Sequence, residues 1–525
     1  MTDRKQHVGH VALAESVPAA RASPPAGLTS AAADGVRWTL LGAVASFAVQ
    51  VPYTAAMSRL LTPGDFGLVG LAMFMLRFLS YFAQSGLSAA VVQRPVLEVR
   101  HVRAALAVGI VTGVGVFAVC WFISPFGVQL VNGPRELVPV CRVLALTFVV
   151  SAVGSTAVGV LRRDMRYKSL ALTEFGSYLF GYCGVGLTSA LGGSGVWSLV
   201  HAAVGQCAVM AAVSIALVRH DPRPLFSLRS MREMASFSTR LSCVGFLEFL
   251  TISGDSFVIG RYAGTEMLGY YNRAWFIAAL PLHQVATAVN KVLFSAFSRI
   301  QADGARLKSA YVDSLAMTSL LFLFMAATIA ACSGNSVHVL LGEGWDVTAG
   351  LVPPLAALGA LNVVTYFPAA VAAAMERVWQ RAVIEMLHLV VLIAGVGFAI
   401  AFGSGIHGLV IALLMCRLVQ HLAYVLWMGR VIPGSARHVG ICYLEASLVA
   451  LIAGLSVTAV GHVTYGTVPP AAALAAQLVT AALLGAVLLR YGGSLQGIRV
   501  VHQRALIPSV FTTTLTVRGR TSPDR

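Results

Sequence analysis

The residues of this chain that could do chemistry are polar side chains inside long apolar segments. An ionisable group there is costly unless it is paired or hydrated, so it indicates either a buried network or a water-filled cavity. The candidates for lining such a cavity are Gln50, Arg77, Tyr81, Gln84, Arg240, Gln284 and Lys291. The candidates for balancing these cations, or for binding a coupling ion, are Glu248 and Asp255.

The spacing of these residues places them on single helix faces. In the second apolar segment, Arg77, Tyr81 and Gln84 follow i, i+4, i+7 spacing. In the seventh, a sector of about 80° of a helix holds Arg240, Glu248 and Asp255. The first and eighth segments continue the pattern with Gln50, Gln284 and Lys291. A buried network of mutually neutralising charges could explain any single one of these residues. However, polar stripes, meaning polar residues along one helix face, recur on the first two segments of each half. This recurrence favours a cavity through which a charged or hydroxylated solute is transported.

No catalytic motif in the sequence offers another explanation for these polar residues. The sequence has no Gly-rich phosphate loop, nucleophile elbow or His-Glu-x-x-His motif. Its eight cysteines form no Cys-x-x-Cys pair and accompany no histidine cluster, so they indicate neither a metal site nor a disulfide framework. We therefore expect no enzyme activity, no metal and no cofactor.

The elements that must position the polar stripes are membrane-spanning helices. Hydrophobic residues make up 57% of the 525 and charged residues 11%, and the mean hydropathy is +0.79. A span needs roughly 20 apolar residues. Fourteen segments satisfy this, over residues 36–58, 66–91, 104–124, 137–160, 170–190, 196–218, 236–260, 269–293, 310–332, 351–374, 382–402, 406–428, 441–462 and 470–490. The sequence thus predicts an all-α polytopic membrane protein with about 14 transmembrane helices.

The charges of the connecting loops predict the orientation. Basic loops, such as 161–168 and 219–232, alternate with loops that hold little or no Lys or Arg, such as 192–194, 342–344 and 403–405. By the positive-inside rule, the basic loops and both termini are cytoplasmic. Topology and contacts with anionic membrane lipids also explain the net charge of +16. No nucleic-acid partner is expected, because no contiguous basic face with interleaved aromatics occurs.

A short internal repeat divides the chain. The stretch 59–67, Arg-Leu-Leu-Thr-Pro-Gly-Asp-Phe-Gly, is echoed 202 residues later by 261–269, Arg-Tyr-Ala-Gly-Thr-Glu-Met-Leu-Gly. The echo falls where a parallel six-helix repeat would place it. The predicted parts are a disordered cytoplasmic tail (1–33), an N-lobe (34–219), a cytoplasmic loop (220–235), a C-lobe (236–430), two further helices (431–490) and a basic cytoplasmic tail (491–525).

Five stretches carry a resemblance to a known family. They are residues 58–68, 86–93, 161–168, 254–264 and 268–274. Together with the fourteen-span layout, they resemble the polysaccharide transporter family, the Wzx-type oligosaccharide flippases of the multidrug/oligosaccharidyl-lipid/polysaccharide exporter superfamily. The resemblance covers roughly residues 34 to 490 and carries over no substrate-contact residues.

The resemblance implies two six-helix lobes and a bacterial inner-membrane location. It also implies an undecaprenyl-diphosphate-linked oligosaccharide as substrate, for exopolysaccharide, capsule or O-antigen biosynthesis. Alternating access would be driven by the membrane potential or by a coupling ion, H⁺ or Na⁺. A polymerase and the export machinery of the same pathway are expected as further partners.

Four alternatives stay open at this point. A multidrug or cation antiporter of the same superfamily would share the fold but usually has twelve spans. A flippase for the peptidoglycan lipid precursor is close in kind. A major-facilitator exporter would carry a Gly-x-x-x-Asp-Arg loop where this chain has Gln93-Arg-Pro-Val-Leu. A polysaccharide polymerase would need a large external loop, and the predicted outer loops are short.

Overall fold

The computed structural model describes residues 28–83, 99–218, 253–300, 304–375, 377–493, 495 and 497–499. All regular structure within these ranges is helical. The long apolar runs explain this, because in lipid a helix satisfies every backbone polar group within its own segment.

The first set of helices, which we call the N-terminal bundle, extends to residue 218. Its elements are α1 (Leu28–Leu60), α2 (Pro63–Ala83), α4 (Val99–Leu130), α5 (Leu137–Arg163), α6 (Tyr167–Tyr178), the π-helical turn η1 (Leu179–Gly186), α7 (Leu187–Leu191) and α8 (Val196–Val218). Small residues allow close packing within it. Gly154 lies against Ala211, and Gly181 lies against the backbone of Gln206.

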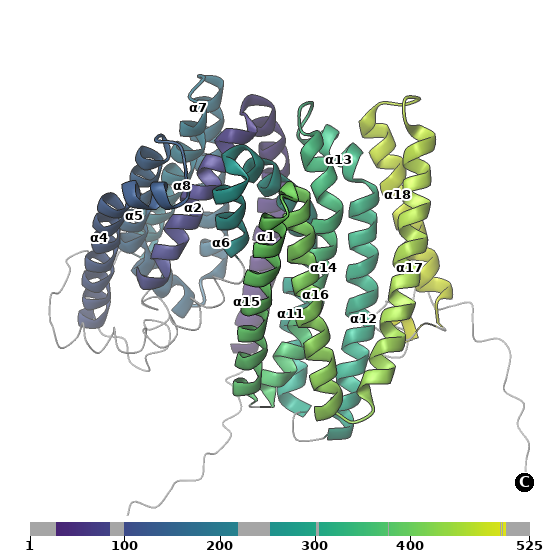
Figure 1. The fold of residues 1–525 in the computed structure, drawn as a ribbon. Coiled ribbons are helices and arrows are strands. Elements are labelled where there is room, and N and C mark those ends of the chain that lie inside the picture. The colour runs from purple at the N-terminus through teal and green to yellow at the C-terminus, as the bar shows by residue number, and fades with distance from the viewer. Residues whose placement is uncertain are drawn as a thin grey trace, which may run out of the picture.

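The second set, which we call the C-terminal bundle, begins with a helical stretch over residues 253–262. It continues with α11 (Gly264–Ile300), α12 (Gly304–Ala331), α13 (Ser333–Leu340), α14 (Asp346–Ala374), α15 (Val378–Ala401) and α16 (Gly405–Val431). Two further helices, α17 (Ser435–Thr464) and α18 (Pro470–Tyr491), pack against α12 and α13 at the edge of this bundle (Figure 1).

Two helix pairs make the main contacts between the bundles. Helix α2 packs along α11, and α1 meets α13 (Figure 1). All four helices border the corners at 61–62, 263 and 341–345, so the bundles are joined at one end of the molecule. This end carries the loops that the charge pattern predicts to be external.

Eleven helices of the described ranges are long and apolar enough to cross a membrane, so the chain is a multi-pass membrane protein. The predicted fifth and eighth spans are helical but are not among the eleven. The fifth is divided by η1, and α11 carries Glu266, Arg273 and Lys291. Most of the predicted seventh span, 236–260, lies outside the described residues. The count of fourteen and the domain limits therefore stay predictions.

Candidate functional site

Five of the predicted site side chains fall outside the structural description. Gln84, Arg240 and Glu248 lie in ranges that the structure does not describe. Tyr81 and Lys291 belong to α2 and α11, and only their backbone is described. Their contribution to a cavity stays a prediction.

Arg77 lies on the side of α2 that faces the C-terminal bundle. It follows Gly70 by seven residues, nearly two helical turns, and Gly70 touches Asn272 of α11. Near Gly70 the two helices are in contact, whereas the Arg77 side chain is exposed. It makes no hydrogen bond or ion pair with any residue that the structure describes. Arg77 is therefore a cation free to meet a solute beyond the point where the bundles touch.

The two glutamines of the predicted set whose side chains are described are half-buried. Gln50 lies on α1 and Gln284 on α11. Within the described ranges, no hydrogen bond joins Arg77 to either of them. The structure therefore places these three residues on inner helices without assembling them into one contact network.

Asp255 is held by its own bundle. Its carboxylate accepts hydrogen bonds from the Tyr271 hydroxyl, from the Ser256 backbone N–H at 2.6 Å and from the Ser256 hydroxyl at 3.3 Å. No Lys or Arg of the described residues pairs with it. These contacts tie the 253–262 stretch to α11, and the predicted part of Asp255 in charge balance or ion coupling stays a hypothesis.

Arg273 is a site residue that the sequence did not reveal. It extends from α11 toward the N-terminal bundle, and its guanidinium carbon lies 4.2 Å from the centre of the Phe66 ring on α2. Its Nε atom is buried and has no hydrogen-bond partner. No carboxylate of the described ranges neutralises it. An unpaired guanidinium between two membrane helix bundles is a strong candidate for binding an anion.

From the sequence alone, Arg273 looks like an ordinary charge at the end of a span, because it lies only four residues inside the predicted eighth span, 269–293. The internal repeat could have found it. At the offset of 202, the counterpart of Arg273 is Leu71, which is buried and apolar. A cation that replaces a core leucine in one copy of a repeat indicates a function specific to that copy.

Three tyrosines surround the same position. The rings of Tyr178 and Tyr182 stack with centroids 4.7 Å apart, and Tyr53 of α1 meets Tyr182 edge-on at 5.2 Å. Arg273 lies close enough to the Tyr53 and Tyr178 hydroxyls to interact electrostatically. The Tyr53 hydroxyl is buried without a partner. We call these four residues the arginine–tyrosine cluster.

The cluster depends on the π-helical turn. Tyr178 is the last residue of α6, and Tyr182 lies within η1. Short π-helical insertions are rare and occur frequently at functional sites. The cluster offers one cation, phenolic hydroxyls and aromatic faces. This combination suits a phosphate group next to a sugar ring.

A second polar network lies inside the C-terminal bundle. Glu385 of α15 accepts hydrogen bonds from Gln420 and Tyr424 of α16, both at 2.9 Å. Arg417 donates to the Asn362 and Gln420 side-chain oxygens. Because its members satisfy one another, this network ties α14, α15 and α16 together and leaves few groups for a ligand.

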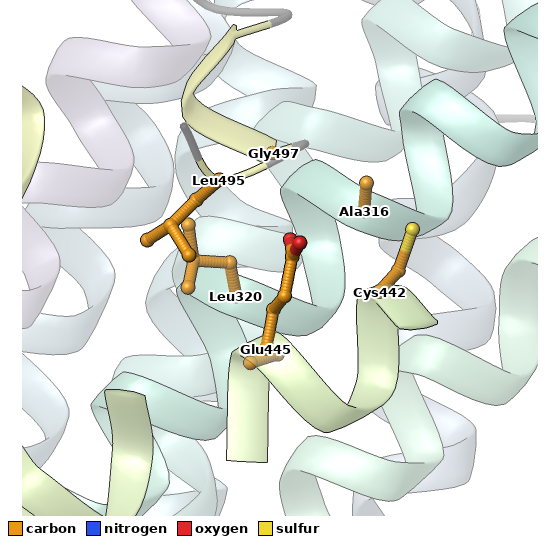
Figure 2. A pocket seen from close by; sticks show the side chains of 7 residues that line it. Ala316, Leu320, Cys442, Glu445, Leu495 and Gly497 are labelled. Atoms are coloured by element: carbon orange, nitrogen blue, oxygen red, sulfur yellow. The ribbon is translucent and has the colours of Figure 1, made fainter. Parts of the chain in front are cut away.

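One recess lies near the C-terminal end of the described chain. Figure 2 shows it between α12, α17 and the segment that follows α18. It leaves essentially no space for even a water-sized molecule, whereas small-molecule sites hold roughly 300–1,000 Å³. Its lining residues are Ala316, Leu320, Cys442, Glu445, Ala446, Leu495 and Gly497. Within the described part of the chain, no group of His, Cys, Asp or Glu residues could hold a metal ion.

Comparison with known proteins gives the family. A profile described as "polysaccharide biosynthesis protein" matches residues 56–350, more than half of the chain. The chain belongs to this family. Its relatives include Wzx-type exporters, so the family is one of membrane transporters for polysaccharide biosynthesis and not of enzymes.

Two curated relatives illustrate the match. The succinoglycan biosynthesis transport protein ExoT of Rhizobium meliloti is 28% identical over 59% of this chain and 62% of its own length. The lipopolysaccharide biosynthesis protein WzxC of Escherichia coli is 22% identical over 63% of this chain and 67% of its own length. The alignment with the succinoglycan protein therefore spans less than two thirds of that relative.

Solved structures give the fold. The lipid II flippase MurJ in an inward closed conformation superposes with a TM-score of 0.68, over 89% of this chain and 99% of MurJ, at 13% identity. An inward-facing multidrug transporter of the MATE family superposes with a TM-score of 0.56, over 74% and 96% of the two chains, at 18% identity. The chain has the fold of this exporter superfamily.

Proposed function

We propose that the protein is a flippase for a polyprenyl-diphosphate-linked oligosaccharide. It carries the substrate outward across the bacterial inner membrane for exopolysaccharide, capsule or O-antigen synthesis. The family and the printed roles of its relatives support the pathway. The unpaired Arg273 between the bundles is the single observation that carries the substrate class, because a diphosphate is the ligand that such a guanidinium would recognise.

Two cations at different depths support a path between the bundles. Measured from the Gly67–Gly269 contact, Arg273 is four residues along α11 and Arg77 is ten residues along α2. At the helical rise, these positions lie about 6 Å and about 15 Å from the contact. A diphosphate could pass from one to the other while the polyprenyl chain stays in lipid.

The proposed mechanism is alternating access by two six-helix lobes within a fourteen-span layout. Cytoplasmic loading precedes opening toward the outer side, and H⁺, Na⁺ or the membrane potential supplies the driving force. Asp255 and Glu248 are the proposed ion-coupling residues. A polymerase and the export machinery would take the substrate from the outer face.

Deleting the gene tests this function. Surface polysaccharide should be lost while intact lipid-linked oligosaccharide accumulates on the cytoplasmic face, because the chain moves the substrate without altering it. Normal polysaccharide together with raised sensitivity to cationic drugs would favour an antiporter. Loss of cell-wall synthesis with normal surface polysaccharide would favour a flippase for the peptidoglycan precursor.

A further inference from the structure

The contact between α2 and α11 is reciprocal. A Cβ atom on Gly67 would overlap the carbonyl oxygen of Thr265, and a Cβ atom on Gly269 would overlap the carbonyl oxygen of Pro63. At the repeat offset of 202, Gly67 corresponds to Gly269 and Pro63 to Thr265. Each copy of the repeat therefore makes the same contact on the other, as in a two-fold symmetric dimer.

Only glycine permits this approach, since any side chain would meet backbone rather than a movable group. One turn further along the helices, a Cβ atom on Gly70 would also overlap the Asn272 side chain. The two backbones thus touch at Gly67 and Gly269, and at Gly70 the backbone of α2 meets the Asn272 side chain. This is closer than helices with ordinary side chains can approach.

Hydrogen bonds between the end of α1 and the C-terminal bundle also hold the two bundles together at this end. Arg59, at the end of α1, donates to Val339 O at 2.7 Å and to Leu340 O at 3.4 Å. These are the last carbonyls of α13, where a cation is favoured. The Trp345 indole N–H donates to Ser58 O at 3.1 Å. The repeat counterpart of Arg59, Arg261, instead lies over Tyr262 of its own segment.

The aromatic packing connects this contact to the arginine–tyrosine cluster. Trp345 lies edge-on to Phe66, with ring centroids 5.8 Å apart, and Arg273 covers the Phe66 ring. Phe66 belongs to α2, whereas Trp345 and Arg273 belong to the C-terminal bundle. Separating α2 from α11 would therefore break both contacts and release the guanidinium.

We infer that Gly67, Gly70, Gly269 and Asn272 form a gate that closes the outer end of the transport path, with Arg59 and Trp345 as its latch. The inference rests on the proposed alternating access. The gate must open in every cycle, and its opening withdraws Arg273 from Phe66 so that a bound diphosphate can leave. The glycines allow α2 and α11 to come together and separate, because no side chain at these positions interdigitates with the other helix.

A reversible cross-link tests the gate. The Cβ position of residue 70 lies 3.3 Å from the Asn272 Cγ atom, where a cysteine sulfur would lie. At that separation a sulfur on the Cβ of residue 70 can reach a sulfur on residue 272 to form the S–S bond of about 2.0 Å. We expect the Gly70→Cys/Asn272→Cys protein to cross-link in membranes under mild oxidation. Transport should fall to background and return when a reductant is added.

Each single-cysteine variant should transport equally with and without oxidant, which controls for the native cysteines. Cross-linking is read on gels without any substrate, so it remains informative if the proposed substrate is wrong. Full cross-linking with undiminished transport would overturn the gate. Failure to cross-link would overturn the contact itself.

Alanine variants test the glycines separately. Gly67→Ala and Gly269→Ala should each slow formation of the 70–272 disulfide by about tenfold or more, because a methyl group is forced into filled space. The two effects should be similar in size, since the contacts are reciprocal. Gly64→Ala is the matched control on α2, because its Cβ would meet only Thr62 Oγ1 at 3.7 Å. Unchanged cross-linking in both gate variants would contradict the inference.

Discussion

At the scale of single residues, the charges between the bundles differ in kind. Asp255 has hydrogen-bond donors from its own bundle, whereas Arg273 has aromatic neighbours and no counter-ion in the described ranges. A half-buried cation whose Nε atom is buried without a partner costs free energy of folding. Arg273 is therefore better explained by ligand binding than by stability.

Replacing Arg273 with Gln should reduce transport at least about tenfold, since a charge-assisted contact with phosphate is lost. The amount of protein in the membrane should stay equal or rise, because an unpaired charge is removed. Arg273→Lys should retain part of the activity. Quantifying transport per molecule checks this, and a fall in protein level with intact transport per molecule would make Arg273 structural.

The latch allows a second comparison at this scale. Arg59→Gln removes the cap on α13 and should lower the rate of 70–272 cross-linking several-fold, because the closed gate loses charge-assisted hydrogen bonds. Its repeat counterpart serves as the control. Arg261→Gln should leave the rate unchanged, since Arg261 lies over Tyr262 and no hydrogen bond joins it to the described residues of the N-terminal bundle. Equal effects of both variants would argue against a latch on one side only.

At the scale of elements, the network of α14, α15 and α16 indicates that these helices move together. Removing Glu385 leaves the charge of Arg417 without its acidic neighbour. We expect Glu385→Leu to lower the free energy of unfolding by about 2 kcal/mol, less than for a fully buried pair because both side chains are partly exposed. The double variant with Arg417→Met should recover much of that loss. Thermal unfolding of the purified protein measures both, and purely additive losses would contradict coupling.

The sequence predicted elements better than contacts. Apolar runs are set by bilayer thickness, so spans such as 137–160 and 196–218 coincide with α5 and α8. The repeat at Gly67 and Gly269 was visible, but their contact was not, because periodicity does not say which helices touch. The π-helical turn η1 has no distinctive hydrophobic periodicity in the sequence, so it could not be predicted. The lack of a partner for Arg273 could be seen only in the structure, because it depends on which residues of the neighbouring bundle surround the guanidinium.

At the scale of the whole molecule, the two bundles meet at one end. Ser194 and Ser404 lie at corners on this end, where the loops lack basic residues. In intact cells, cysteines placed at these two positions should react with an impermeant thiol reagent, and a cysteine at Ser230 should not. The opposite labelling would invert the orientation and make the gate a cytoplasmic one.

Under the proposed orientation and mechanism, the closed end and the exposed Arg77 belong to a carrier that is ready to receive substrate from the cytoplasm. Neither feature requires a catalytic group. We propose that such a chain moves its substrate unchanged, and direct observation of that movement is the decisive test.

Purified full-length protein in liposomes provides this test. A polyprenyl-diphosphate oligosaccharide placed in the outer leaflet should become protected from an impermeant glycan-oxidising reagent as it is moved inward. The Arg273→Gln protein should protect at the rate of empty liposomes, and a polyprenol without diphosphate should not be moved. Equal protection with and without the wild-type protein, or equal movement of the uncharged lipid, would contradict a diphosphate-selective flippase.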